Sequence, residues 1–311
     1  MSAVQQVRGT QSFVSVMSEV WRRPSLSVLE IVWRWAISAP ILALAIFESA
    51  RFMHSITLNT AALEAMTVFQ PVAAFRTIDA TMAAVMPGAR PIALWLLPLA
   101  AAAWLIVAAL GRTVVLRRFD RTLHARPLAL LALGTLRAIL LTAVWMLWFG
   151  LIARAGSVAI TGPAAQGGEP NIVLYAAIMI CGTLVLYVLW GIFSWPLYLA
   201  PLLAMERDLG TVAALGSALR SSRVRGKLIE INLVMNIVRI ALIVLAMVFS
   251  ASPLPFSSVE TQTFLICWWS GVMLLFLAMS DYFHVVRSVA YLSLWQALQI
   301  ESSHPQPSIY T

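Results

Sequence analysis

Charged side chains that could bind an anion occur inside the apolar runs of this sequence. Arg34, Arg137 and Arg239 each lie eleven or twelve residues after a basic residue that precedes such a run. At about 1.5 Å of helix rise per residue, each would lie roughly 15 Å into a bilayer, near its middle. A guanidinium is planar and offers several N–H donors, which suits the oxygens of phosphate or carboxylate. The three arginines are therefore candidate ligands for an anionic molecule, and their regular spacing favours three similar helical hairpins.

Further polar residues share helix faces within the same runs. An arginine in the bilayer core costs at least a few kcal/mol unless it faces protein, water or a counter-charge. We therefore expect these faces to point into a bundle, either as ion pairs that fix packing or as the wall of an anion pocket. A proton or ion pathway through Asp281 and His284 is a third hypothesis. The polar positions are Glu30 and Arg34 in the first run, Asn232, Asn236 and Arg239 in the fifth, and Asp281 and His284 in the sixth.

Residue types that commonly perform catalysis are sparse. The chain has 4 histidines, and Asp281 and His284 could place two metal ligands on one helix face without an evident third. The sequence contains no HExxH, GxSxG, Walker-type loop or dinucleotide fingerprint. Its 2 cysteines are isolated, so neither a metal site nor a disulfide framework is expected. We predict that the protein is not an enzyme and uses no cofactor or metal; an intramembrane enzyme using Asp281 and His284 is a minor alternative.

Composition predicts an all-α integral membrane protein. The chain is 61% hydrophobic and only 11% charged, with a mean hydropathy of +0.87. Soluble domains carry about 25% charged residues, and a membrane-spanning helix needs about 20 apolar residues. We expect a polar segment 1–25, a six-span membrane domain 26–298 and a tail 299–311. The six transmembrane helices are expected at about 26–47, 92–115, 128–152, 172–203, 228–249 and 264–286.

The basic residues alternate between connectors and thereby predict an orientation. Excess lysine and arginine mark cytoplasmic connectors, so we expect both termini in the cytoplasm. The same rule accounts for the net charge of +8, and nucleic-acid binding is not expected. Instead, we expect a bilayer partner, with anionic phospholipid near the basic connectors. The residues of this basic surface are Arg117, Arg118, Arg121, Arg220, Arg223, Arg225 and Lys227.

Two connectors have the periodicity of amphipathic surface helices. The outer connector 48–90 is expected to contain two such helices, separated by Pro71, with Pro87-Gly88 ending the second. In the cytoplasmic connector between spans four and five, Thr211 is the expected N-cap of a short helix. Apolar residues then recur at helical spacing, the helix ends in basic residues, and Gly226 is the expected stop.

The same cytoplasmic connector carries a resemblance to a known family. The run PLLAME at 201–206 is followed by Leu209-Gly210, by AAL at 213–215, by Ser217 and Ser221, and by RGK at 225–227. This pattern resembles the bacterial polytopic membrane domain fused to some glycerophosphoryl diester phosphodiesterases and also found alone in inner-membrane proteins of unassigned function. The resemblance implies a six-helix domain in a bacterial inner membrane. It implies no hydrolase activity, because the phosphodiesterase domain is not in this sequence.

Three functions follow from these observations as hypotheses. The leading one is a non-catalytic scaffold or accessory subunit that engages anionic lipid, a partner protein or further copies of itself. The main alternative is a small transporter or lipid-handling protein that binds an anionic ligand near the bilayer midplane through Arg34, Arg137 and Arg239. An intramembrane enzyme is the third.

Overall fold

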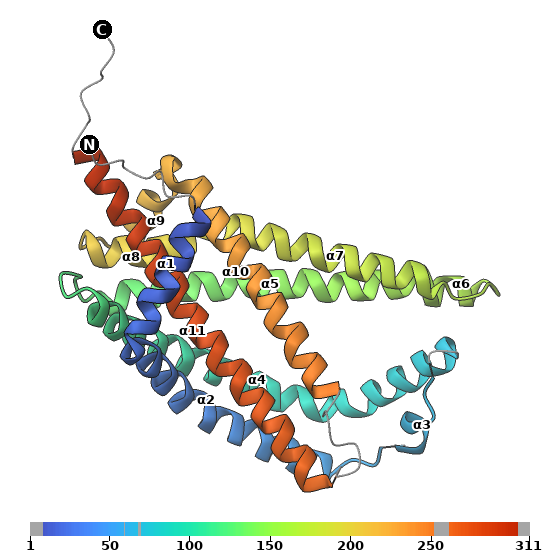
Figure 1. The fold of residues 1–311 in the computed structure, drawn as a ribbon. Helices are drawn as coiled ribbons and strands as arrows, with labels where there is room; N and C mark the ends of the chain where they lie inside the picture. The colour runs from blue at the N-terminus through green and yellow to red at the C-terminus, as the bar shows by residue number, and fades with distance from the viewer. Residues whose placement is uncertain (1–8, 59, 68–69, 252–260, 304–311) are drawn as a thin grey trace. The chain divides into compact units, whose positions relative to one another are not determined.

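The computed structural model describes residues 9–58, 60–67, 70–251 and 261–303, and in these residues the regular structure is entirely helical (Figure 1). Six helices are long and apolar enough to cross a membrane, which confirms the predicted all-α class and the number of candidate spans. The elements are α1 (Gly9–Arg22), α2 (Pro24–Met53), α3 (Thr60–Glu64), α4 (Pro71–Phe119), α5 (Pro127–Gly156), a π-helical turn (Ser157–Thr161), α6 (Gly162–Ala165), α7 (Ile172–Phe193), α8 (Trp195–Glu206), α9 (Thr211–Arg220), α10 (Ser222–Ala251) and α11 (Gln262–Ser303).

The chain divides into two compact units. The first contains Met1–Arg34, Ala109–Leu133 and Gly191–Thr311, and the second contains Trp35–Ala108 and Gly134–Trp190. The buried core of the first unit surrounds α8, whose residues from Trp195 to Met205 are nearly all inaccessible to solvent. Aliphatic and aromatic side chains from α4, α5, α10 and α11 complete this core, which holds the functional groups described below.

The fourth apolar run is two helices rather than one. α7 ends at Phe193 and α8 begins at Trp195, with the buried Ser194 between them. Pro196 occupies the first turn of α8, where a missing backbone N–H costs nothing and the fixed φ suits a helix. Pro196 has no backbone N–H with which to continue the hydrogen bonds of α7, so the break falls just ahead of it. The fourth apolar run therefore contains a helix break.

The outer connector differs from its prediction. The first expected surface helix is reduced to the single turn and a half of α3, and the second does not end at Pro87-Gly88. Instead, α4 continues from Pro71 to Phe119 with Pro87, Pro91 and Pro98 inside it. The prediction of a break was wrong because a proline removes one backbone hydrogen bond, which a long helix in an apolar setting tolerates by local adjustment.

The boundary between α9 and α10 also differs from its prediction. α9 occupies Thr211–Arg220, but Gly210, rather than Thr211, takes the N-cap position. The helix ends at Ser221, whose hydroxyl donates to the Ser217 carbonyl over 2.7 Å. The expected stop at Gly226 was wrong, because this residue lies inside the first turns of α10. The basic residues after Ser221 therefore begin a long helix instead of ending a short one.

The N-terminal segment contains a helix that periodicity did not predict. α1 packs against α11 and α10, with Val16 and Val20 buried. The Tyr282 hydroxyl donates to the Met17 carbonyl over 3.1 Å, and the ring of Tyr282 meets Trp21 edge to face. Part of segment 1–25 therefore belongs to the packed core of the first unit.

Candidate functional site

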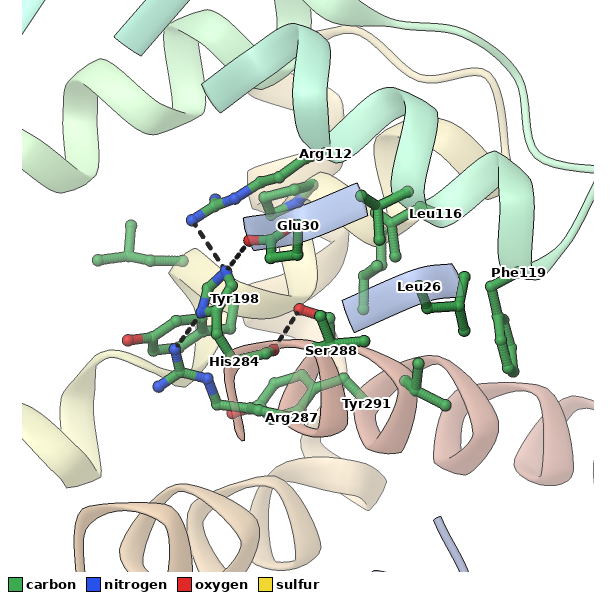
Figure 2. A pocket seen from close by; sticks show the side chains of 16 residues that line it. Leu26, Glu30, Arg112, Leu116, Phe119, Tyr198, His284, Arg287, Ser288 and Tyr291 are labelled. Atoms are coloured by element: carbon green, nitrogen blue, oxygen red, sulfur yellow. Dashed lines mark hydrogen bonds and ion pairs between the residues drawn. The ribbon is translucent and has the colours of Figure 1, made fainter. Parts of the chain in front are cut away.

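Charged and aromatic side chains from α2, α4, α8 and α11 surround a cavity of about 40 Å³ in the first unit (Figure 2). This volume accommodates roughly three water molecules at 10–15 Å³ each, or one compact polar group. The polar or ring-bearing residues that line it are Glu30, Arg112, Tyr198, His284, Arg287, Ser288 and Tyr291.

Arg34 is fully engaged by two carboxylates beside this cavity. Its Nε lies 2.7 Å from Oε1 of Glu30, one helical turn earlier, and its Nη1 donates to Oδ1 of Asp281 over 2.6 Å. Trp33 Nε1 donates to the other oxygen of Glu30 over 2.9 Å. Glu30 is only 2% exposed. Buried carboxylates are tolerated when they are paired and hydrogen-bonded, so Arg34 and its partners form a closed ion-pair group that joins α2 to α11.

His284 lies between two further arginines. Its Nδ1 is 2.9 Å from Nη2 of Arg287, and its Nε2 is 3.5 Å from Nη2 of Arg112. The same Nε2 is 3.7 Å from Oε1 of Glu30. A guanidinium can only donate, and a neutral imidazole has one donor and one acceptor nitrogen. A neutral His284 would accept from Arg287 at Nδ1 and carry its proton on Nε2, toward Glu30.

Arg287 lacks a carboxylate partner within the described part of the chain. Its guanidinium stacks over the Tyr198 ring at 4.0 Å from the centroid and donates to His284. Its buried Nε has no hydrogen-bond acceptor among the described residues. A ring face and a neutral imidazole are weak partners for a desolvated cation compared with a carboxylate or phosphate oxygen. Arg287 therefore retains the capacity to donate to an anion in this cavity.

The formal charges around the cavity do not balance. Glu30 and Asp281 carry two negative charges, whereas Arg34, Arg112 and Arg287 carry three positive ones, which leaves one net positive charge with His284 neutral. This surplus lies at one end of the cavity, and Leu26, Leu116 and Phe119 line the other end (Figure 2). The arrangement therefore favours a compact anionic group at the arginine end.

The structure brings together only some of the residues predicted to form the anion pocket. Glu30, Arg34, Asp281 and His284 come together as described above. Asn232 donates to the Gly191 carbonyl over 3.3 Å, and a Cβ at Gly191 would lie 2.5 Å from Nδ2 of Asn236. These two asparagines therefore support close packing of α10 against the α7–α8 junction. Arg239 is exposed on α10, and Arg137 belongs to the second unit.

Sequence reasoning missed the two arginines that line the cavity. Arg112 stands near the end of an apolar run, where arginine is common and does not by itself indicate a site. Arg287 follows His284 by three positions, and this spacing places both on one helix face. Continuing the polar face of Asp281 and His284 by another three residues would have identified Arg287.

The predicted basic surface is partly described. Six of its members are solvent-exposed, and the side chain of Arg223 lies outside the described residues. The exposed members are Arg117, Arg118, Arg121, Arg220, Arg225 and Lys227.

A second cluster of polar side chains holds together the connectors at the same end of the helices as the basic surface. Arg126 Nε donates to Oδ1 of Asp208 over 2.5 Å, and the backbone N–H of His124 donates to the Met205 carbonyl over 2.7 Å. Asp208 adopts φ of 54°, which aspartate tolerates better than most residues. Asp120 accepts from the Thr122 hydroxyl over 2.7 Å and from Gln296 Nε2 over 2.8 Å. The connector after α4 is thereby tied to both the α8–α9 turn and α11.

These contacts lower the pKa of both aspartates. The hydrogen bond from Arg126 holds the pKa of Asp208 below its ordinary value, and Asp208 in turn raises the pKa of Arg126. The hydrogen bond from Thr122 is the main cause of the lowered pKa of Asp120. Both carboxylates are therefore ionised in the folded protein near neutral pH.

Within the described residues, no group of three or more His, Cys, Asp or Glu side chains converges. No protein-family model, no curated protein and no solved structure matches the chain. The resemblance of residues 201–227 to the bacterial membrane domain therefore stays a prediction. Functional inference depends on the geometry of the cavity.

Proposed function

We propose that this protein is a non-catalytic, multi-pass membrane protein that holds the anionic group of a ligand between Arg112 and Arg287. The observation that carries the proposal is the setting of Arg287. This cation lines a cavity and has a buried Nε–H without an acceptor in the described chain. Phosphate, sulfate and carboxylate groups all supply the missing oxygen acceptor.

Arg34 provides an internal comparison that supports this proposal. Arg34 pairs with two carboxylates, with Nε 2.7 Å from Glu30 and Nη1 2.6 Å from Asp281, as expected for a structural ion pair. Arg287 has a neutral imidazole and a tyrosine ring instead. If Arg287 served packing alone, a carboxylate or an apolar side chain would be the less costly solution. A bound anion accounts for the difference.

The anionic group has two plausible sources with the same chemistry. Glu30 lies six residues after the start of α2, and Arg112 lies seven residues before the end of α4. At about 1.5 Å per residue the arginine end is roughly 10 Å inside these helix ends. A phospholipid headgroup drawn inward would suit a scaffold that engages anionic lipid. A soluble anion would suit a small transporter.

The experiment compares wild type with the Arg112→Gln/Arg287→Gln double variant and with an Arg239→Gln control. Arg239 is exposed on α10, so the control removes an arginine from the same unit without touching the cavity. One arm uses native mass spectrometry after purification from phosphatidylcholine nanodiscs that contain phosphatidylglycerol. The other arm titrates sulfate by calorimetry into protein in a nonionic detergent.

Retention of phosphatidylglycerol by the wild type and control, with loss in the double variant, supports a lipid source. Sulfate binding with the same pattern supports a soluble anion. The double variant removes two positive charges, which could change its stability. Thermal unfolding of all three proteins is therefore measured alongside both binding experiments. A wild type that holds neither probe, or a double variant that unfolds like wild type and binds both probes equally well, contradicts the proposal.

A scaffold that binds a partner protein is a second candidate, favoured by exposed apolar residues on α1 and α9. Val14 is 66% exposed, Trp21 73% and Val212 85%. Replacing Val14 and Val212 with serine should weaken a partner complex while leaving the unfolding temperature nearly unchanged. Crosslinking in intact membranes, with Leu128→Ser as the matched control at another exposed position, tests this candidate.

A further inference from the structure

His284 lies where the anion would bind, and its contacts constrain when it can carry a proton. We propose that the bound anion is accompanied by a proton, which His284 takes up from water at Nδ1. The inference rests on the proposed function, because it concerns the same cavity. It adds a regulatory property: affinity for the anion increases as pH falls.

The contacts of His284 with two arginines fit a neutral imidazole. Nδ1 accepts from Nη2 of Arg287 over 2.9 Å, so a proton on Nδ1 would face a donor. Nε2 carries the remaining proton toward Glu30, 3.7 Å away. A second positive charge at His284 would also adjoin Arg112 at 3.5 Å and Arg287, which like-charge repulsion opposes. The two arginines therefore disfavour a second proton on the imidazole.

An anion between the arginines reverses both constraints. Its oxygens are stronger acceptors for Arg287 than an imidazole nitrogen, so Nδ1 loses its donor. Nδ1 can then bind a proton and donate to the same anion. With His284 protonated, the five charged side chains and the imidazole sum to two positive charges, which a doubly charged anion neutralises. Protonation and anion binding therefore strengthen each other by the same factor, as linkage requires.

Groups on every neighbouring helix bear on this histidine. α2 contributes Glu30 and Arg34, α4 contributes Arg112, and α8 contributes Tyr198 beside Arg287. On α11 itself, Asp281 is held by Arg34, and the Ser288 hydroxyl donates to the His284 carbonyl over 3.0 Å.

The helices α1 and α10 also pack against α11, and their titratable groups are exposed or have partners other than His284. On α1, Glu19 pairs with Arg23 over 3.5 Å, and on α10, Glu230 is exposed. The Tyr282 and Tyr291 hydroxyls donate to backbone carbonyls. Among the residues that contact the cavity, His284 is therefore the side chain suited to take up a proton near neutral pH.

The test is calorimetry of the full chain in a nonionic detergent with sulfate as the probe. Sulfate does not change its own charge near neutral pH, so any proton uptake belongs to the protein. Titrations in two buffers of different ionisation enthalpy count the protons bound per sulfate. We expect up to one proton per sulfate, and affinity that rises by up to about tenfold for each pH unit lowered between about pH 8 and about pH 6.

His284→Gln is the deciding variant, and Arg239→Gln is its control. Glutamine keeps a polar side chain but cannot take up a proton, so we expect sulfate binding whose affinity no longer depends on pH. The control should behave like wild type. Proton uptake that persists in His284→Gln would overturn the inference, because another group would then be responsible.

The inference and the proposed function fail in different ways. If wild type binds sulfate without proton uptake and with pH-independent affinity, the inference is wrong and the anion site stands. If wild type binds neither sulfate nor phosphatidylglycerol at any pH in this range, the proposed function is wrong and the inference falls with it. If His284→Gln fails to fold, a wild-type count of zero protons per sulfate still overturns the inference.

Discussion

Arg34 and Asp281 form an ion pair of 2.6 Å between residues separated by 247 positions in the chain. Their side chains are 15% and 8% exposed, so the pair is largely removed from solvent. The contact joins the first and last apolar runs of the protein near the cavity. It also removes Arg34 from the set of arginines available to an external anion.

Arg34→Met should destabilise the protein strongly. The change leaves Glu30 and Asp281 as buried carboxylates without their shared cation, and breaking such a pair costs on the order of 3–5 kcal/mol. Thermal unfolding in detergent should show a large decrease in the midpoint. Arg239→Met removes an exposed arginine and should change the midpoint little. Equal midpoints for the two variants would contradict the assignment of Arg34 as a structural residue.

Two glycine substitutions should have opposite effects on stability. A Cβ at Gly111 would lie 2.4 Å from Cδ2 of the Trp33 ring, so Gly111→Ala forces a rigid ring to move. Such overpacking costs about 1–3 kcal/mol. Gly216 lies inside α9 with no heavy atom within 4 Å of a Cβ, so Gly216→Ala should stabilise by about 0.5–1 kcal/mol through helix propensity. Chemical denaturation of both variants measures the difference, and a stabilising Gly111→Ala would refute the packing at Trp33.

The connectors should weaken in acid through Asp120 and Asp208. Their pKa values are lowered in the folded protein by Thr122 and Arg126 respectively, relative to the ordinary aspartate value of about 3.9. The stabilisation is therefore present above that ordinary value and is lost as pH falls through the lower folded value. The unfolding midpoint of wild type should fall between about pH 5 and about pH 3.

The Asp120→Asn/Asp208→Asn double variant should show a smaller acid-induced decrease than wild type. Asparagine tolerates the positive φ at position 208, so the substitution tests charge rather than backbone strain. Asp79→Asn, at an exposed position on α4, is the matched control. An acid response that is identical in wild type and the double variant would show that these two carboxylates do not contribute.

The predicted orientation can be checked by cysteine labelling. With Cys181 and Cys267 changed to serine, single cysteines are placed at Gly168, in the α6–α7 connector, and at Arg118, on the basic surface. A membrane-impermeant maleimide should label Gly168→Cys in intact cells and Arg118→Cys only after permeabilisation, because basic connectors stay in the cytoplasm. Labelling of Arg118→Cys in intact cells would reverse the proposed orientation.

Sequence alone predicted the number and approximate positions of the apolar helices. A backbone in hydrocarbon must satisfy its own hydrogen bonds, so long apolar runs have one regular solution. Local spacing also predicted that Glu30 shares a face with Arg34, and that Asp281 shares one with His284. Sequence did not predict that α4 would continue through its prolines, because helix continuity there depends on adjustment of the surrounding backbone.

Tertiary structure decided which polar faces meet. The spans are apolar on nearly every face, so the sequence pattern contains little information about helix rotation. Only packing places Asp281 against Arg34 and brings Arg112 and Arg287 to the two nitrogens of His284. The sequence predicted arginines inside the apolar runs. The fold determined that Arg34 pairs with two carboxylates and that Arg287 faces the cavity without a carboxylate partner among the described residues.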